Sequence, residues 1–343
     1  MRRSSVLLGL AIGLALADSS VVTLALPDVL VRFDLEVTEV AWVLISYNLV
    51  LALVAVPAAY LARRRPARAF VAGVLVFAAA SLACGLAPSF GVLVGARCVQ
   101  AVGGAFVIGA ALDLLTESEG SDARGARVWA VAGVVGAALG PAAGGILTQG
   151  LGWEWIFLLQ APLVLVGLAA VRGVAWRPLP APAGRPHVGA NLALLLLSGG
   201  LVGALFLLVL LLVEGWRLSP AAAGLVVTAM PLAAIAAGRL AAAAGDVLVR
   251  AVAGVVLVAG GLVALALLPG AGWGWTLPPQ LLVGVGIGLT LVALTERALA
   301  GRSAQVVHGG WTIASRHAGV VLGLLLITPV FTSALERNQD EAL

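Results

Sequence analysis

Eleven apolar runs, each long enough to cross a lipid bilayer, constrain this chain more than any other feature of its sequence. A helix needs about 20 predominantly apolar residues to span the hydrocarbon core of a membrane. Charged or proline-rich breaks separate the runs, so each run predicts one transmembrane helix. The runs fall near 5–31, 38–62, 68–87, 90–115, 126–149, 154–173, 189–213, 220–243, 248–268, 276–299 and 306–331. The expected fold class is an all-α polytopic membrane protein with about eleven transmembrane helices visible.

The composition excludes a soluble globular protein. Of the 343 residues, 62% are hydrophobic and 10% are charged, whereas soluble domains carry about 25% charged residues. The net charge of +4 does not indicate nucleic acid, because basic loops beside apolar spans arise from membrane orientation. Cys84 and Cys98 both lie in apolar runs, which gives no support for a disulfide framework or a metal site. Walker-type and Ser-His-Asp patterns are also lacking, so we expect no enzyme activity, no cofactor, no metal and no nucleic-acid partner.

The distribution of the 20 basic residues, all of them arginines, predicts the orientation in the membrane. Fifteen lie in loops on the side of the N-terminus, and the opposite side holds only Arg32, Arg217 and Arg337. Because cytoplasmic loops carry an excess of basic residues, we expect the N-terminus in the cytoplasm. The lack of lysine and the abundance of Ala, Gly and Val hint at a GC-rich bacterial genome. The expected location is the bacterial inner (cell) membrane, with multiple passes.

One proline-rich break suggests that the chain has two halves. It predicts a cytoplasmic linker at 175–188, between an N-terminal six-helix bundle at 1–174 and an incomplete C-terminal bundle of about five helices at 189–343. The fourth and tenth spans share a weak glycine-rich similarity. Duplicated halves are typical of secondary transporters, which bind substrate near the membrane midplane between the halves. No twelfth apolar run follows 306–331, so either the polypeptide is cut short or it ends outside.

A glycine-rich stretch in the fifth run carries Gly136, Gly140, Pro141, Gly144 and Gly145. The proline removes a backbone donor and bends the helix. Glycines spaced by four residues leave a smooth groove against which another helix can pack closely. From physics alone the stretch is a kinked, tightly packed membrane helix, and the bend and the groove together suggest a hinge-like contact.

The pattern G-x-x-x-G-P-x-x-G-G resembles the antiporter motif in the fifth helix of drug exporters of the major facilitator superfamily, and every fixed position is present. Five other segments resemble motifs of the same family, in family order. They are Asp18–Pro27, Trp42–Leu49, Arg97–Ala105, Trp153–Pro162 and, in a shorter pattern of the eleventh span, Arg316–Gly323. The first departs from its signature at Ala17 and Thr23, which replace Leu and Asn. The resemblance covers nearly the whole chain.

One loop departs from the family pattern. Between spans two and three the family has G-x-L-A-D-R-x-G-R-R, whereas here Arg63 replaces the acid and Pro66 replaces the second glycine. This puts an inner gate closed by that carboxylate in doubt. The motifs favour the fourteen-span branch of these exporters, whereas the short linker favours a twelve-span plan.

The resemblance implies a function and leaves one alternative. It implies a proton-coupled secondary transporter that exports hydrophobic or amphipathic small molecules by alternating access, with the small-molecule substrate, protons and the lipid bilayer as partners. We expect a monomer. The alternative is a transport-inactive or truncated membrane module for interaction or sensing, because the loop motif is altered and a twelfth span is missing.

Two charges within spans form the main candidate site for proton coupling. An ionisable side chain at the centre of a membrane helix costs about 2.5–3.5 kcal/mol on insertion scales and is a functional candidate by default. At about 1.5 Å per residue, Asp18 and Arg97 fall at coinciding depths on antiparallel spans, which allows a contact. Burial favours a neutral acid whereas a nearby arginine favours the carboxylate, so the acid could switch. The pair is either a structural ion pair or a proton site.

Three further polar residues are candidates for lining the substrate cavity or for gating, together with the glycines and proline of the fifth run. Gln100 belongs to the fourth-helix motif, and Arg316 and His317 share the eleventh span. A histidine titrates near neutrality. His317 is therefore either a titrating group or a hydrogen-bonded packing residue.

Overall fold

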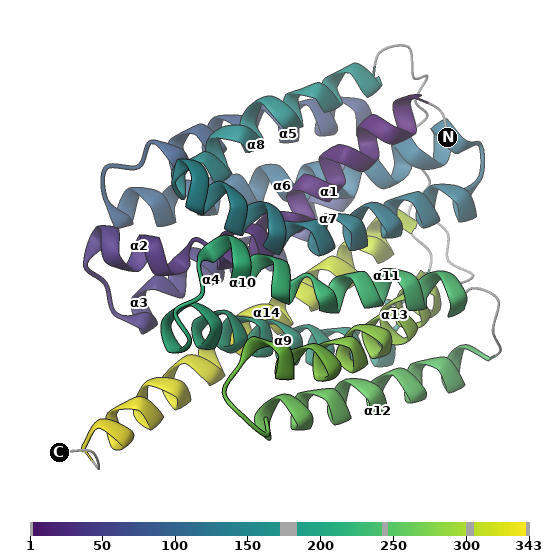
Figure 1. Cartoon of the computed structure of the whole chain (residues 1–343). Helices are drawn as coiled ribbons and strands as arrows, with labels where there is room; N and C mark the ends of the chain where they lie inside the picture. Colours follow the sequence, from purple (N-terminus) through teal and green to yellow (C-terminus); the bar gives the residue numbers. More distant parts are fainter. Residues whose placement is uncertain (1–2, 172–183, 242–245, 300–304, 341–343) are drawn as a thin grey trace.

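The computed structural model describes residues 3–171, 184–241, 246–299 and 305–340, and the regular elements within them are helices. In this described part, eleven helices are long and apolar enough to cross a membrane, as the apolar runs predict. They lie side by side in an elongated bundle, with the N-terminus at one end and the C-terminus beyond the other (Figure 1). The predicted linker falls largely on residues 172–183, which lie outside the described residues, so the division into two bundles stays a prediction.

We call α1–α8 the N-terminal group and α9–α14 the C-terminal group. The N-terminal group comprises α1 (Arg3–Thr23), α2 (Leu26–Phe33), α3 (Val37–Val40), α4 (Trp42–Ala62), α5 (Pro66–Gly85), α6 (Phe90–Glu119), α7 (Asp122–Leu151) and α8 (Glu154–Val166). The C-terminal group comprises α9 (Val188–Leu210), α10 (Pro220–Val227), α11 (Ala229–Ala241), α12 (Val247–Ala266), α13 (Leu277–Leu299) and α14 (Gln305–Asp340). The end of the bundle that holds Arg3 is called the N-terminal end, and the opposite end, with α2 and α3, the far end (Figure 1).

The first predicted run is not one helix. α1 ends at Thr23 and α2 begins at Leu26, so the membrane span is shorter than the run at 5–31. Pro27 explains the break, because it has no N–H to donate to the carbonyl of Thr23 and its ring crowds that carbonyl. Pro231 has the same relation to Val227, where α10 ends.

The last helix is longer than its apolar run. α14 continues past the predicted end at 331 as far as Asp340. Glutamate and arginine, which occur in this polar extension, are good helix formers outside an apolar environment. The helical segment therefore extends beyond the predicted membrane span.

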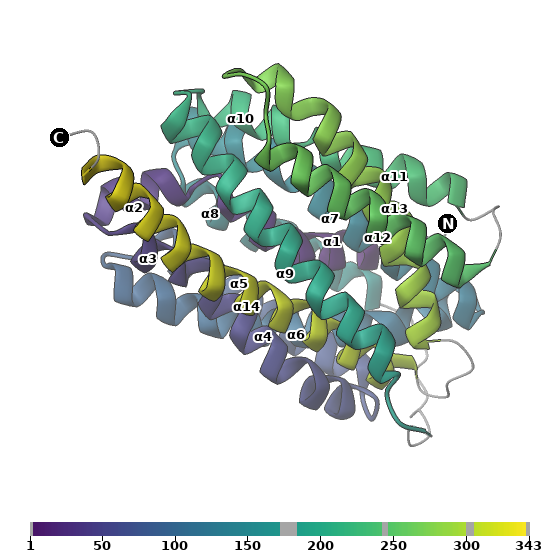
Figure 2. The same ribbon diagram turned by 90° about the horizontal axis from the view of Figure 1, so that it is seen from below.

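Apolar side chains pack the N-terminal group and the C-terminal group against each other. One core cluster lies within the N-terminal group and includes Ile313 of α14. A second cluster, towards the far end, joins Leu44 of α4 to Phe206 of α9 and Leu324 of α14. Figure 2 shows α14 running beside α4 and α9 along the length of the bundle. The polar residues described next lie between these apolar clusters.

Candidate functional site

Asp18 of α1 and Arg97 of α6 meet inside the bundle. Arg97 Nη1 donates a hydrogen bond to Asp18 Oδ2, and both side chains are completely buried. The contact that the matching depths allow is therefore present. Because a buried pair balances its own charge, the helices α1 and α6 can carry these groups within the span.

The guanidinium of Arg97 is held by four other groups. Its Nε donates to the carbonyl of Val43 at 3.0 Å, and its Nη1 donates to Gln100 Oε1 at 2.6 Å. Its carbon lies 4.3 Å from the ring centroid of Tyr47 and 5.6 Å from that of Phe157. A cation over an aromatic face is stabilised by the negative face of the ring, more strongly where water is excluded. These contacts fix Arg97 against α4 and α8.

Gln100 connects the pair to two other helices. Its Nε2 donates to Ser81 Oγ of α5 at 2.9 Å and to Gln160 Oε1 of α8 at 2.9 Å. Sequence reasoning missed Ser81 as a site residue, and quoted Gln160 only as part of a motif. The available signal was a polar side chain inside an apolar run. A hydrogen-bonded network of this kind specifies one arrangement of the helices it joins.

Two polar atoms of the pair remain without a hydrogen-bond partner in the described part of the chain. They are Asp18 Oδ1 and Arg97 Nη2, and both are buried. Most buried polar atoms in proteins have a partner, so an exception needs an explanation. Because only Oδ2 is engaged by Arg97, a proton can bind Oδ1 without first displacing the guanidinium.

A second polar group links the N-terminal group to the C-terminal group. Asn48 Nδ2 of α4 donates to the carbonyl of Leu44 at 2.8 Å and to Ser19 Oγ of α1 at 3.0 Å. Because a backbone carbonyl only accepts, this assigns the amide nitrogen to that side, and Asn48 Oδ1 faces His317 Nδ1 of α14 at 2.6 Å. His317 therefore carries its proton on Nδ1 and is buried as a hydrogen-bonded residue between the groups.

Arg316 is placed differently from its neighbour. It is part-buried, and within the described residues no hydrogen bond or ion pair to it is found. The structure thus brings Asp18, Arg97 and Gln100 together, whereas His317 contacts Asn48 and Arg316 makes no hydrogen bond or ion pair among the described residues.

The glycines of α7 make contacts with two different helices. Gly136 lies against the backbone of Gly13 on α1, Gly140 against Ser20 and Gly144 against the backbone of Val21. The close helix packing that the spacing predicts is therefore present, and the partner is α1.

The remaining glycine of this stretch faces the C-terminal group. Gly145 lies against the backbone of Pro220 on α10, and Gly224 of α10 lies against the carbonyl of Pro141. The helix α7 stays continuous through Pro141. This small-residue contact between α7 and α10 holds the two groups together near the far end.

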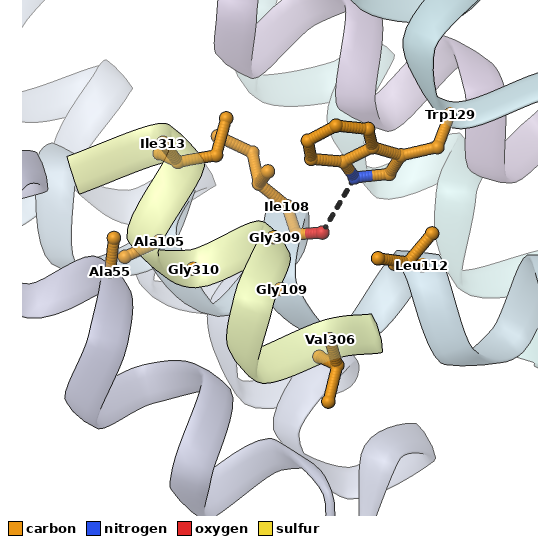
Figure 3. Close-up of a pocket in the computed structure, with 10 residues that line it drawn as sticks. All are labelled: Ala55, Ala105, Ile108, Gly109, Leu112, Trp129, Val306, Gly309, Gly310 and Ile313. Carbon is orange, nitrogen blue, oxygen red and sulfur yellow. Dashed lines mark hydrogen bonds between the residues drawn. The ribbon is translucent and has the colours of Figure 1, made fainter. Parts of the chain in front are cut away.

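A small apolar pocket lies between α4, α6, α7 and α14 (Figure 3). Trp129 forms one wall, and its Nε1 donates to the carbonyl of Ile108 at 3.1 Å. The free volume is about 10 Å³, which is room for about one water molecule. Sequence reasoning did not predict this pocket, because its walls come from four helices.

Among the described residues, no group of three His, Cys, Asp or Glu side chains could hold a metal ion. The described residues instead form a helical bundle with eleven candidate membrane spans and with charged and amide side chains buried inside it, an arrangement typical of polytopic membrane transport proteins. A family model described as the Major Facilitator Superfamily matches residues 8–332. The chain belongs to this superfamily.

Comparison with individual proteins agrees with this family. The chain is 36% identical over 186 residues to the drug efflux pump JefA of Mycobacterium tuberculosis, a match that covers 53% of this chain and 37% of that protein. It is 35% identical over 166 residues to the methylenomycin A resistance protein of Streptomyces coelicolor, covering 47% of this chain and 35% of that protein. The matches therefore span about a third of the length of these relatives.

A solved structure shares the fold over nearly the whole chain. It is the crystal structure of a bacterial homologue of the human lysosomal transporter Spinster, in an inward-facing and unoccupied conformation. The two superpose with a TM-score of 0.74 at 17% identity, covering 99% of this chain and 85% of that one. At this identity the likeness establishes the fold.

Proposed function

We propose that this chain is a proton-coupled exporter of hydrophobic or amphipathic small molecules, of the drug:proton antiporter type. It works by alternating access in a bacterial cell membrane, as a monomer with its N-terminus in the cytoplasm. The observation that carries the proposal is the buried Asp18, which has one carboxylate oxygen on Arg97 and the other without a partner in the described structure. The relatives named as a drug efflux pump and a resistance protein support export of small molecules.

The proposed coupling follows from the change of charge on Asp18. A proton on Oδ1 neutralises the carboxylate and weakens its attraction to Arg97, since the opposite charge is lost. Arg97 then keeps Val43 and Gln100 as acceptors on α4 and α6. Protonation therefore loosens α1 from α6 while the guanidinium stays in place.

The proposed alternation requires the contacts between the two groups to break and re-form. In this structure, Gly145 on Pro220 and Gly224 on Pro141 hold α7 and α10 together near the far end. Opening towards that end needs this contact to separate. Substrate and proton would favour different states of the cavity, which couples the two fluxes.

The test uses proteoliposomes in which a pH gradient drives efflux of a fluorescent amphipathic dye. Asp18→Asn keeps the size of the side chain and an oxygen that can accept from Arg97, but it removes the carboxyl group that could carry a proton. We expect gradient-driven efflux to fall to the background rate while dye binding stays within twofold. The control Glu214→Gln removes a carboxylate that is 51% exposed and should transport normally. Wild-type gradient-driven efflux in Asp18→Asn would end the proposal.

A double variant separates coupling from a purely structural pair. Removing one member of a buried ion pair strands the other charge and costs about 3–5 kcal/mol, whereas removing both avoids that cost. Asp18→Asn combined with Arg97→Gln should therefore recover thermal stability relative to Arg97→Gln, yet remain uncoupled. If the double variant recovers both stability and gradient-driven transport, the pair is structural only.

A further inference from the structure

Arg316 lies near the middle of a membrane span. It is ten residues beyond Val306, where that span begins, which is roughly 15 Å along the helix and so about half of the hydrocarbon core. Arg97, which is completely buried at span depth, has Asp18 as its counter-ion. Within the described residues Arg316 has no such partner.

The contacts of α14 place Arg316 on the face that points into the protein. Gly309, seven residues earlier on the same stripe, lies against Leu112 of α6, and Ile313 packs into the core of the N-terminal group. One turn further on, Val320 packs against the far-end core cluster. Most of the exposed apolar side chains of α14 lie on another face, namely Trp311, Leu322, Leu325 and Leu326, and Val330 is exposed beyond them near the far end of the bundle. Arg316 therefore lies at the interface of the two groups and stays part-exposed there.

An unbalanced cation at this depth is costly unless an anion reaches it. The planar guanidinium of arginine suits a carboxylate, sulfonate or phosphate, because two parallel N–H donors can bind two oxygens. Gly309 and Ile313 line the pocket that also contains Ile108 and Trp129 (Figure 3).

We infer that Arg316 binds the acidic group of an amphipathic substrate whose apolar part lies towards Ile108 and Trp129. The pocket is too small for such a molecule in this state, with about 10 Å³ free. Binding therefore requires α14 to move away from α6 and α7, which is the movement that alternating access supplies. The inference rests on the proposed function for that cavity. It narrows the proposed substrates to amphipathic molecules that carry one acidic group.

The test compares two fluorescent probes with the same skeleton, 8-anilinonaphthalene-1-sulfonate and the neutral N-phenyl-1-naphthylamine. Binding to the full chain is measured in nanodiscs of phosphatidylcholine, without any gradient. We expect Arg316→Gln and Arg316→Met to bind the sulfonate at least tenfold more weakly than wild type, with the neutral probe unchanged within twofold. Arg316→Lys keeps the charge but lacks the two parallel N–H donors, so its sulfonate affinity should lie between those of wild type and Arg316→Gln. The control Arg217→Gln, at a side chain that is 82% exposed, should bind both probes as wild type.

Each contrary result has a distinct meaning. If the Gln and Met variants keep the wild-type ratio of the two affinities, the inference is wrong even where proton-driven transport is present. If the ratio depends on Arg316 but transport ignores the gradient, the proposed coupling fails and the inference stands. A final measurement, in nanodiscs that contain phosphatidylglycerol, tests whether Arg316 binds a lipid headgroup. A sulfonate affinity that falls with phosphatidylglycerol in wild type, but not in Arg316→Gln, would assign a lipid headgroup to Arg316 and overturn a substrate site.

Discussion

The two oxygens of the Asp18 carboxylate have different surroundings, and this asymmetry gives the residue its proposed role. Oδ2 accepts from Arg97, whereas Oδ1 is buried without a partner in the described structure. A fully satisfied carboxylate would have to lose a hydrogen bond before it could bind a proton. Asp18 does not, so its charge can change while the Arg97 network with Gln100 stays in place.

Asp28 lies outside the membrane spans, and its raised pKa predicts that the stability of the protein depends on pH. Partial burial, and then the negative charges of Glu154 and Glu214, raise the pKa of Asp28 above its ordinary value of 3.8. A raised carboxylate pKa means that the folded state binds the proton more tightly than the unfolded state, so stability falls as pH rises through this window. At neutral pH, Asp28→Asn should therefore stabilise the protein, by at most about 0.5 kcal/mol as for most surface changes.

Thermal unfolding between pH 3.5 and 7.5 measures this effect. The gain from Asp28→Asn should shrink as pH falls towards 3.8, since the wild-type carboxyl is then protonated as well. Asp34→Asn, which removes the same charge from the exposed end of α2, serves as the control. An equal pH dependence in both variants would contradict the assignment to Asp28.

The contact between His317 and Asn48 joins α14 to α4 and allows the two interpretations of His317 to be separated. An asparagine places an N–H donor near the position of the histidine Nδ1, so His317→Asn should keep the bond to Asn48. His317→Leu leaves Asn48 Oδ1 with only the 3.3 Å bond from Ser19 and should cost about 1–3 kcal/mol, the penalty for a lost buried partner.

The measurements are the unfolding temperature and gradient-driven efflux. For a packing residue, His317→Asn should match wild type in both, and His317→Leu should be less stable. If His317→Asn keeps its stability but loses coupling, His317 itself carries a transported proton. In that case the hydrogen-bonded packing interpretation is wrong.

The helix α7 contacts α1 of its own group through Gly136, Gly140 and Gly144, and it contacts α10 through Gly145. A Cβ on Gly145 would collide with the backbone of Pro220, and a backbone collision cannot be relieved by a side-chain rotation. Gly145→Leu should therefore push α7 and α10 apart near the far end and reduce efflux at least tenfold, while the contacts of α7 with α1 remain.

A matched control lies five residues along the same helix. Gly150 has open space around its Cβ position, so Gly150→Leu should transport normally. Crosslinking between cysteines introduced on α7 and α10 should decrease in Gly145→Leu and stay unchanged in Gly150→Leu. Normal efflux in Gly145→Leu would show that this contact only packs the helices.

At the scale of the whole molecule, the proposed functional charges lie in two different places relative to the two helix groups. The Asp18 and Arg97 pair is enclosed within the N-terminal group, while His317 and Arg316 approach from the C-terminal group. The N-terminal group thus contains the proposed proton site, and the interface contains the proposed substrate contact. In the proposed cycle, movement between the groups changes the substrate contact at the interface and leaves the Asp18 and Arg97 pair intact.

Sequence alone determined the features that depend on one segment at a time. The eleven spans follow from local apolar runs, and the Asp18 and Arg97 contact was allowed because depth along a membrane helix can be counted. The prediction of one helix at 5–31 was wrong, because Pro27 ends α1 at Thr23. The signal for this break, a proline four residues later, is present in the sequence. The close packing of α7 followed from glycine spacing, without its partner being identified.

Only the tertiary structure decided which helices are neighbours and how each is rotated about its axis. It brought Ser81 and Gln160 to Gln100, Asn48 to His317, and left Arg316 without a counter-ion in the described chain. Apolar runs that are hydrophobic all round contain no signal for rotation, because lipid and protein interior favour the same side chains. The partners of a buried polar group are therefore set by the packing of the whole bundle.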